Sequence, residues 1–326
     1  MKAKKSHIEA ARKIFSFLKA NDHFLLSAHI NADGDAVASV IAMGLLLEKM
    51  KKNYYMVFHD EQVDTRFKYL KNFDKIYHYD FSLRLPIRSA VILDAPGIKR
   101  LGKVAKLLPD RSQIVKIDHH PVEDDFAAIT MVDEGASSAT QLIYEVIELS
   151  KIKCNLDLAE AIYTGIVYDT GRFSFSNTTA RDMYICGKMI ESGVEPAKIN
   201  DRIFFENSFE AIRTIGRGLA DMENFLDGRV NVIYLDFDTM RQNHHGEIEE
   251  LANYSVAIRG GKVGVFIREI RPGFHKISLR SKDEINVNII AKKFQGGGHM
   301  RAAGCRLEGT KREVIDQIIK EIAKQL

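Results

Sequence analysis

The chain has 326 residues, enough for about two domains of ordinary size. Its 45% hydrophobic and 28% charged residues are typical of globular proteins and exclude a disordered chain, a collagen-like repeat and a coiled-coil rod. Its three cysteines are too few and too scattered for a disulfide framework or a cysteine-based zinc site. A membrane-spanning helix needs about 20 consecutive apolar residues, and we find no apolar run of nearly that length. The basic N-terminal residues are not followed by the apolar segment that a signal peptide needs. We therefore expect a soluble, cytoplasmic protein with no membrane partner.

The formal net charge of +3 hides an uneven distribution of charge. Residues 259–301 contain ten Lys or Arg and three Asp or Glu, so the rest of the chain is mildly acidic. A basic segment on an acidic body favours an anionic ligand bound at that segment.

Strand-like and helical patterns alternate through the first half of the chain. Short apolar runs predict strands, and apolar residues at helical spacing predict helices. The predicted strands cover residues 24–28, 55–58, 90–93 and 114–117, and the predicted helices cover 36–50 and 156–168. This alternation predicts βαβ units, and hence a parallel sheet with flanking helices.

The second half has a different pattern. A helical stretch over 182–210 is interrupted at Gly193 and Pro196, and alternating strands at 230–235, 262–269 and 275–280 precede a closing helix at 311–325. We interpret His244 and His245 as ordinary loop residues. We expect an α/β protein with a catalytic metal-binding domain at 1–190, a helical linker at 191–220 and a smaller α/β substrate-binding domain at 221–326.

Carboxylates and imidazoles follow three of the predicted strands. Because ligands bind beyond the carboxyl ends of parallel strands, we expect these side chains to meet in one crevice. The set comprises His29, Asp33, Asp35, Asp94, Asp118, His119, His120 and, from a helix end, Asp169. Each aspartate alone would be read as a helix cap or loop residue. Together, several carboxylates at close range would repel one another unless cations neutralise them. Oxygen-rich sites with a few imidazoles suit Mn²⁺ or Mg²⁺.

Two such cations about 3.5–4 Å apart form the kind of site that activates water and clamps a phosphoryl group. We expect Asp94 to bridge both ions, because it stands alone between the two clusters. The pattern therefore predicts metal-dependent hydrolysis of a phosphoester.

A glycine-rich string spans residues 295–304. Consecutive glycines allow backbone N–H groups to approach an anion closely, and His299 and Arg301 can add charge-assisted hydrogen bonds to the same phosphate. A glycine run by itself is equally consistent with a flexible turn.

These strings resemble a known family. His29–Asp35, Asp94, Asp118–His120 and Asp169–Gly171 are similar to the four signature motifs of the DHH phosphoesterase superfamily. Ala32 departs from the pattern, since many relatives carry proline there. The glycine-rich string and Ser278–Ser281 resemble the DHH-associated C-terminal domain. Together the two halves cover nearly the whole chain and are most similar to the NrnA-type oligoribonucleases and pAp phosphatases.

The resemblance implies a role for each matched residue. One Mn²⁺ would be held by His29, Asp33 and Asp94, and the other by Asp35, Asp94, His119 and Asp169. His120 would act on the phosphate, with Asp118 orienting the histidines. The substrate-binding residues would be Arg280, Ser281, Gly297, Gly298, His299 and Arg301. The resemblance also implies an active site in the cleft between the domains.

We therefore expect a phosphoesterase with two Mn²⁺, or Mg²⁺ or Co²⁺ in their place, that acts on very short RNA and removes the 3′-phosphate of 3′-phosphoadenosine 5′-phosphate (pAp). Expected partners are short single strands and nucleotide bisphosphates, not long duplex DNA, and a homodimer is left open. Alternatives are a phosphodiesterase for linear or cyclic dinucleotides, a family II pyrophosphatase, a RecJ-like exonuclease and a non-catalytic nucleotide sensor. The glycine-rich string argues against the pyrophosphatase, and the lack of an extra nucleic-acid domain argues against the exonuclease.

Overall fold

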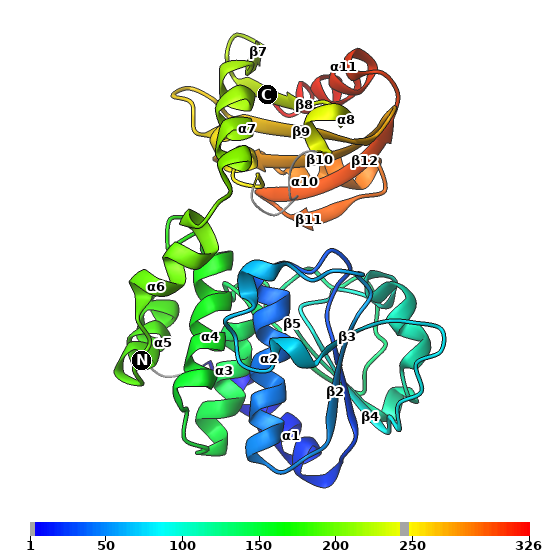
Figure 1. The fold of residues 1–326 in the computed structure, drawn as a ribbon, viewed down its shortest axis with the longest axis vertical. Coiled ribbons are helices and arrows are strands. Elements are labelled where there is room, and N and C mark those ends of the chain that lie inside the picture. Colours follow the sequence, from blue (N-terminus) through cyan, green and yellow to red (C-terminus); the bar gives the residue numbers. More distant parts are fainter. Residues whose placement is uncertain (1–3, 242–247) are drawn as a thin grey trace. The chain divides into compact units, whose positions relative to one another are not determined.

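The computed structural model describes residues 4–241 and 248–326, and it divides into two compact units, Met1–Phe205 and Glu206–Leu326 (Figure 1). The division lies inside the stretch predicted as a linker. That stretch is largely helical, with α6 (Pro196–Asn200) and a π-helical turn (Asp201–Phe205) in the first unit and α7 (Phe209–Ala220) in the second. The His244–His245 pair lies outside the described residues.

The first unit is a six-stranded, fully parallel sheet in the order β3-β2-β1-β4-β5-β6. Its strands are β1 (Phe24–Ser27), β2 (Tyr54–Phe58), β3 (Ile76–His78), β4 (Ser89–Leu93), β5 (Ile114–Asp118) and β6 (Ile129–Val132). Its longer helices are α1 (Lys5–Ala20), α2 (Gly34–Lys49), α3 (Ala139–Ser150), α4 (Leu156–Asp169) and α5 (Ala180–Glu191). The predicted parallel sheet is confirmed.

Both faces of this sheet are covered. Alternate strand residues such as Phe24 and Leu26 pack with α1, α2, α3 and α4, while Leu25 belongs to a separate cluster with the 3₁₀ segment Ile98–Leu107. Burial on both sides explains why β1, β4 and β5 are almost continuously apolar. With both faces covered, only the strand ends and the loops that follow them can reach a ligand.

The second unit has a six-stranded sheet in the order β11-β12-β10-β9-β8-β7, in which β8 and β9 are parallel and the other neighbours antiparallel. Its strands are β7 (Glu223–Phe225), β8 (Val230–Leu235), β9 (Val263–Arg271), β10 (Phe274–Ser281), β11 (Gly297–His299) and β12 (Ala302–Glu308). Its other helices are α8 (Phe237–Met240), α9 (Leu251–Val256), α10 (Val287–Lys293) and α11 (Lys311–Ile322).

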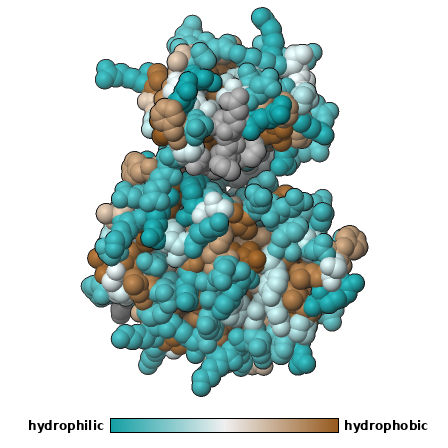
Figure 2. Space-filling view, in the orientation of Figure 1, coloured by the Kyte–Doolittle hydropathy of each residue, from teal (hydrophilic) through white to brown (hydrophobic). Residues whose placement is uncertain are grey.

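The two faces of the second sheet are packed differently. One face forms an apolar core with α10 and α11. On the other face, α7 and α9 pack over a smaller apolar cluster that includes Ile233 and Phe266. Hydrophilic residues dominate the visible surface of each unit, with apolar residues in separate patches (Figure 2). Within residues 4–241 and 248–326, no helix combines the length and the apolar character that crossing a membrane requires.

Candidate metal centre

The polar cluster lies where the order of the parallel strands reverses. From β1 the chain passes outward to β2 and β3, and then returns to β4 on the other side of β1. Such a reversal leaves a crevice at the carboxyl ends of the two strands, where open parallel sheets bind ligands. His29 follows β1, Asp94 follows β4, and His119 follows β5. The topology therefore brings together residues that are 90 positions apart in the chain.

The first motif forms the loop between β1 and α2. Asp33 is the N-cap of α2, because its Oδ1 accepts hydrogen bonds from the backbone N–H groups of Asp35 and Ala36, both at 3.1 Å. An aspartate at this position satisfies backbone donors that a helix start leaves open. The cap fixes where Asp33 and Asp35 lie relative to β1.

Asp94 stands at the middle of the cluster. Its Oδ2 is 3.4 Å from Nε2 of His29, and its Oδ1 is 3.3 Å from Nε2 of His119. The donor atoms of His29, Asp33 and Asp94 form one group within 4.8 Å, and those of Asp35, Asp94 and His119 form another. Asp94 is thus shared by these two groups, and it also belongs to a third with Asp118 and His120. It adopts a left-handed backbone with φ of 50°. Such a conformation is uncommon for a non-glycine residue and is concentrated at functional sites.

The remaining predicted ligand, Asp169, ends α4. Its Oδ2 lies 3.1 Å from Nε2 of His119. The structure therefore brings together all six residues that the resemblance assigns to metal.

Asp118 organises the two histidines that follow it. Its Oδ1 accepts hydrogen bonds from the backbone N–H groups of His119 and His120, at 2.9 and 3.2 Å, and lies 2.9 Å from Nδ1 of His120. Asp118 itself is fully buried. A buried carboxylate bound in this way sets the orientation of the imidazole rings.

Asp35 is held against the start of α3. Its Oδ2 accepts from the backbone N–H of Ala139 at 2.6 Å, and its Oδ1 accepts from the hydroxyl of Thr140 at 2.7 Å. The close approach depends on Gly165 in α4, where an added Cβ would lie 2.5 Å from Oδ1 of Asp35. The N-terminus of α3 carries partial positive charge, which favours a carboxylate there.

The protonation states of the side chains in the cluster depend on the neighbouring charged groups. Burial opposes protonation of His29 and His120, but hydrogen bonds and attraction to neighbouring carboxylates raise the pKa of each to about 9. Burial would raise the pKa of Asp94, but its hydrogen bonds to His119, His120 and His29 hold that pKa well below the usual range. In the metal-free protein, the histidines therefore carry the positive charge that balances Asp94.

The pKa values of two other carboxylates are raised instead. Burial raises the pKa of Asp33 to about 6, partly offset by His29, and burial with repulsion from Asp94 raises that of Asp35. Oδ1 of Asp94 is buried, with Nε2 of His119 and Nδ1 of His120 each 3.3 Å away. Carboxylate and imidazole donors around such a buried oxygen fit hard or borderline divalent cations, which would replace the protons.

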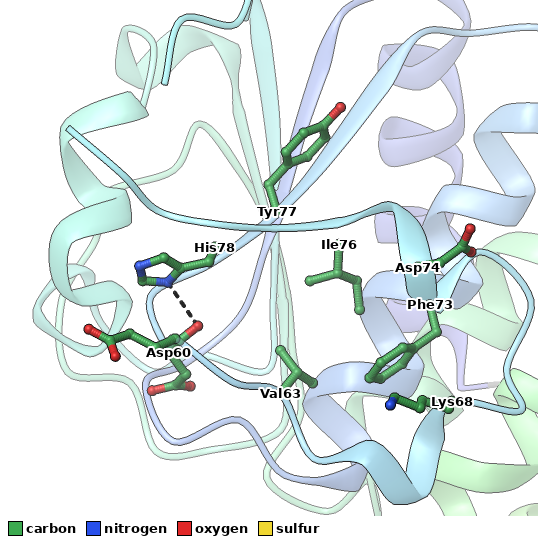
Figure 3. Close-up of a pocket in the computed structure, with 9 residues that line it drawn as sticks. Asp60, Val63, Lys68, Phe73, Asp74, Ile76, Tyr77 and His78 are labelled. Atoms are coloured by element: carbon green, nitrogen blue, oxygen red, sulfur yellow. Dashed lines mark hydrogen bonds between the residues drawn. The ribbon is translucent and has the colours of Figure 1, made fainter. Parts of the chain in front are cut away.

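Asp60 supports the metal-binding loop, a role that our sequence analysis missed. Its two carboxylate oxygens accept hydrogen bonds from the backbone N–H groups of Asn31 and Ala32, at 3.0 and 2.9 Å. Its carbonyl oxygen is 3.0 Å from Nδ1 of His78, at the side of a surface pocket (Figure 3). The available signal was its position just after β2, at the same edge of the sheet as the other acidic residues.

Lys116 is the second residue that we missed. It is 1% exposed, and its Nζ donates to the carbonyl oxygen of Pro96 at 2.9 Å. The same Nζ is 4.0 Å from Oδ2 of Asp118 and 5.4 Å from the centre of the Phe126 ring. A lysine in the middle of an apolar strand was the signal, since a buried charge is rarely retained without a partner.

In the second unit, the register places two of the predicted substrate-binding residues in one row. Arg280 on β10 and His299 on β11 both pair with Ala302 on β12, so the three share one face of the sheet. Nε of Arg280 also donates to Oδ1 of Asn253 on α9 at 3.1 Å.

Among the other predicted residues of this unit, Gly297 and Gly298 precede His299 on β11, whereas Ser281 and Arg301 lie outside this row. Ser281 follows Arg280 directly and so points to the opposite face, where its hydroxyl donates to the carbonyl oxygen of Ile285 at 2.7 Å. Arg301 is exposed in the turn between β11 and β12. Gly298 has φ of 142° and no room for a side chain, since an added Cβ would lie 2.5 Å from the carbonyl oxygen of Ala302. Gly297 pairs with Gly304.

Comparison with known proteins gives two domain matches. The DHH family, N-terminal domain, matches residues 23–166, and the DHHA1 domain matches residues 229–326. Among curated proteins, the chain is similar to the bifunctional oligoribonuclease and PAP phosphatase NrnA of Thermus thermophilus, with 26% identity over 98% of this chain and 95% of the relative. It is 27% identical to the protein of the same name in Bacillus subtilis, over 88% of this chain and 90% of the relative.

Solved structures share the fold. An exopolyphosphatase-related protein from Bacteroides fragilis superposes with a TM-score of 0.87 at 24% identity, covering 98% of this chain and 96% of the other. RecJ from Thermus thermophilus, solved in complex with Mn²⁺, superposes with a TM-score of 0.53 at 12% identity over 98% of this chain and 55% of RecJ.

Proposed function

We propose that this chain, which belongs to the DHH family of phosphoesterases, uses two divalent cations to hydrolyse very short RNA and to remove the 3′-phosphate of pAp. The observation that carries the proposal is the sharing of Asp94 between two groups of potential ligands. A carboxylate common to two donor groups fits a pair of cations about 3.5–4 Å apart, the kind of site that stabilises both the attacking and the leaving oxygens in phosphoryl transfer. The names of the two bacterial relatives support the choice of substrates.

We assign one cation to His29, Asp33 and Asp94 and the other to Asp35, Asp94, His119 and Asp169. Mn²⁺ is our first choice of ion, with Mg²⁺ and Co²⁺ as alternatives, because the donors are oxygens and imidazole nitrogens. Bound cations would supply positive charge to the phosphoryl group and acidify a water molecule.

The residues around the cations have separate tasks. His120 is bonded to Asp118 through Nδ1, which orients the ring, and we assign to its Nε2 the donation of a proton or a hydrogen bond to a phosphate oxygen. Its pKa of about 9 keeps the ring protonated at neutral pH in the metal-free protein. Asp118 fixes the ring, and Lys116 and Asp60 support the loops on which the ligands lie.

We assign binding of a second phosphate group to the second unit, with Arg280 and His299 as the main contacts and Gly297, Gly298 and Arg301 as further ones. The common face of Arg280 and His299 supports this assignment. Ser281 is the weakest member of the predicted set, because its hydroxyl is bonded on the opposite face.

The test is a substrate panel at matched Mn²⁺ concentration: dinucleotides, a five-nucleotide RNA, pAp, linear and cyclic dinucleotide messengers, and pyrophosphate. We expect turnover of the short RNA and of pAp, and loss of that turnover when the cations are removed with EDTA. Hydrolysis of the dinucleotide messengers alone would move the assignment to the alternative phosphodiesterase. No hydrolysis of any member, with nucleotide binding retained, would refute the enzyme and favour a sensor.

A further inference from the structure

The face of the second sheet that carries Arg280 and His299 also carries a second set of basic residues. Lys276 on β10 pairs with Arg268 on β9 and with Arg306 on β12, which makes a row of three basic side chains across neighbouring strands. Lys276 and Arg280 are four residues apart on one strand, so they project from the same face about 13 Å apart.

Between the two basic rows lies a third row of paired residues, and its members on β12 and β11 are glycines. Ser278 pairs with Gly304, and Gly304 in turn pairs with Gly297. A Cβ added to Gly304 would approach one described atom within 4 Å, the carbonyl oxygen of Ile277 at 3.2 Å. The two basic rows therefore border a floor of backbone that an extended chain can approach closely.

Two described carboxylates, Glu249 and Glu308, lie beside the second basic row, and both are already engaged. Glu308 is two residues after Arg306 on β12, so it shares that face, and it forms an ion pair with Arg271. Glu249 forms an ion pair with the buried Arg268, and both groups bond to the hydroxyl of Ser278. Lys276 makes no hydrogen bond or ion pair within the described residues, and Arg306 is exposed. Among residues 4–241 and 248–326, two positive charges of the row thus have no bonded counter-ion.

The electrostatics of Lys276 agree with this geometry. Burial lowers its pKa, attraction to Glu249 partly opposes that, and repulsion from Arg268, Arg306 and Arg280 lowers it further. An anion placed beside Lys276 and Arg306 would relieve this repulsion. The Arg268–Glu249 ion pair forms without Lys276 and Arg306, so these two residues are not needed to stabilise it.

We propose that Lys276 and Arg306 form a second phosphate-binding site, which holds a backbone phosphate of a single-stranded oligonucleotide whose other phosphate lies at Arg280 and His299. The inference rests on the proposed function and adds substrate length to it. About 13 Å separates the two rows at the backbone, a span that an oligonucleotide of several phosphates can bridge. The second row therefore favours short RNA over pAp.

The test compares Lys276→Met with the wild-type full chain in two assays. Binding of a fluorescent five-nucleotide RNA is measured by anisotropy in EDTA, over a series of salt concentrations. Hydrolysis of the same RNA and of pAp is measured with Mn²⁺. We expect RNA binding to weaken about tenfold, as for loss of one charge-assisted hydrogen bond. The slope of log affinity against log salt should fall by about 0.7, the value for one phosphate contact on a single strand.

Three further variants serve as checks. Lys276→Arg should retain the salt slope, and Arg306→Gln, at an exposed position, should reproduce the effect without risk to folding. Lys320→Met removes one charge from α11, which packs on the other face of the sheet, and should change nothing.

The outcomes separate the two proposals. If the wild-type protein neither binds nor hydrolyses the RNA, the proposed function fails. If the wild-type protein does both and Lys276→Met keeps the wild-type affinity and salt slope, the second site is refuted. An equal rise in KM for pAp and RNA would also refute it, since pAp would then reach the same row.

Discussion

The two sheets of this protein present their candidate functional residues in different ways. In the first unit, helices and a 3₁₀ segment cover both faces of a parallel sheet, and the polar cluster lies beyond the strand ends. In the second unit, the basic residues lie within the strands on one face: Lys276 and Arg280 are four residues apart on β10, and Arg268 and Arg306 pair with Lys276. A parallel sheet buried on both sides leaves only its ends for a ligand, whereas an antiparallel sheet can offer part of a face. The comparison indicates where candidate ligand-binding residues occur in each fold. They follow the strands in the parallel sheet, and they lie within the strands in the second sheet.

The charges of the two sites are also opposite. Buried carboxylates at the first site need cations before they can approach a phosphate, whereas Lys and Arg at the second can bind one directly. Changes at the first site should therefore affect metal binding and turnover, and changes at the second should affect substrate binding.

The largest effect is expected for Asp94→Asn. The substitution removes the charge that the two donor groups share, so both cations should be lost and turnover should fall by about a thousandfold or more. Calorimetric titration with Mn²⁺ and steady-state assays check this. Asp125→Asn, at an exposed position in the same unit, is the matched control. Normal metal binding and turnover in Asp94→Asn would disprove the site.

The next effect concerns Lys116→Met. Methionine fills a similar volume, but it leaves the buried Asp118 carboxylate and the carbonyl oxygen of Pro96 without the charge that faces them, and removing one partner of a buried pair is destabilising. We therefore expect a lower melting temperature together with a loss of about 10–100-fold in Mn²⁺ affinity or turnover, as for other groups that orient metal ligands. Thermal melts and metal titrations measure the two separately. A fall in stability with unaltered metal affinity would show that Lys116 serves the core alone.

In the second unit, the substitution His299→Ala should weaken substrate binding. If His299 holds a group remote from the reacting phosphate, KM should rise about tenfold while kcat stays near the wild-type value. Initial rates over a range of pAp concentrations check this, with Lys320→Met as the control. An equal loss in kcat at unchanged KM would place His299 in the chemical step and weaken the contrast between the sites.

The smallest effect is a pH dependence in the second unit. Burial opposes ionisation of Glu249, but Arg268 and other cations hold its pKa at about 2. A carboxylate whose pKa is lowered by folding stabilises the protein above its unfolded pKa of about 4.3, and this stabilisation is lost as the pH falls toward 2. Urea unfolding of wild type and Glu249→Gln should show a difference at pH 7 that shrinks below pH 4. A difference that is constant with pH would contradict the assignment.

Much of the fold followed from local patterns. The predicted strands at 90–93 and 114–117 correspond to β4 and β5, and the helix at 36–50 corresponds to α2. The short edge strands β3 and β6 were missed because they are half exposed and lack a continuous apolar run. The amphipathic helix α1 was also missed, although Ile14 and Leu18 have helical spacing.

The supporting residues could not be inferred in the same way. Asp60 acts through the backbone of a loop nearly 30 residues earlier, and Lys116 through a carbonyl 20 residues away. Local sequence gives no information on such pairs. Ser281 shows the reverse problem: adjacency to Arg280 suggested a shared role, but neighbouring residues of a strand point to opposite faces.

Residue types and their order along the chain were sufficient to predict the candidate ligands and the parallel sheet, because clusters of carboxylate and imidazole after buried strands are costly without a cation. The tertiary structure decided which side chains meet. The strand order puts the ends of β1 and β4 side by side, and the register puts Lys276, Arg306 and Arg280 on one face. Strand order and register arise from packing between distant segments, so no local pattern specifies them.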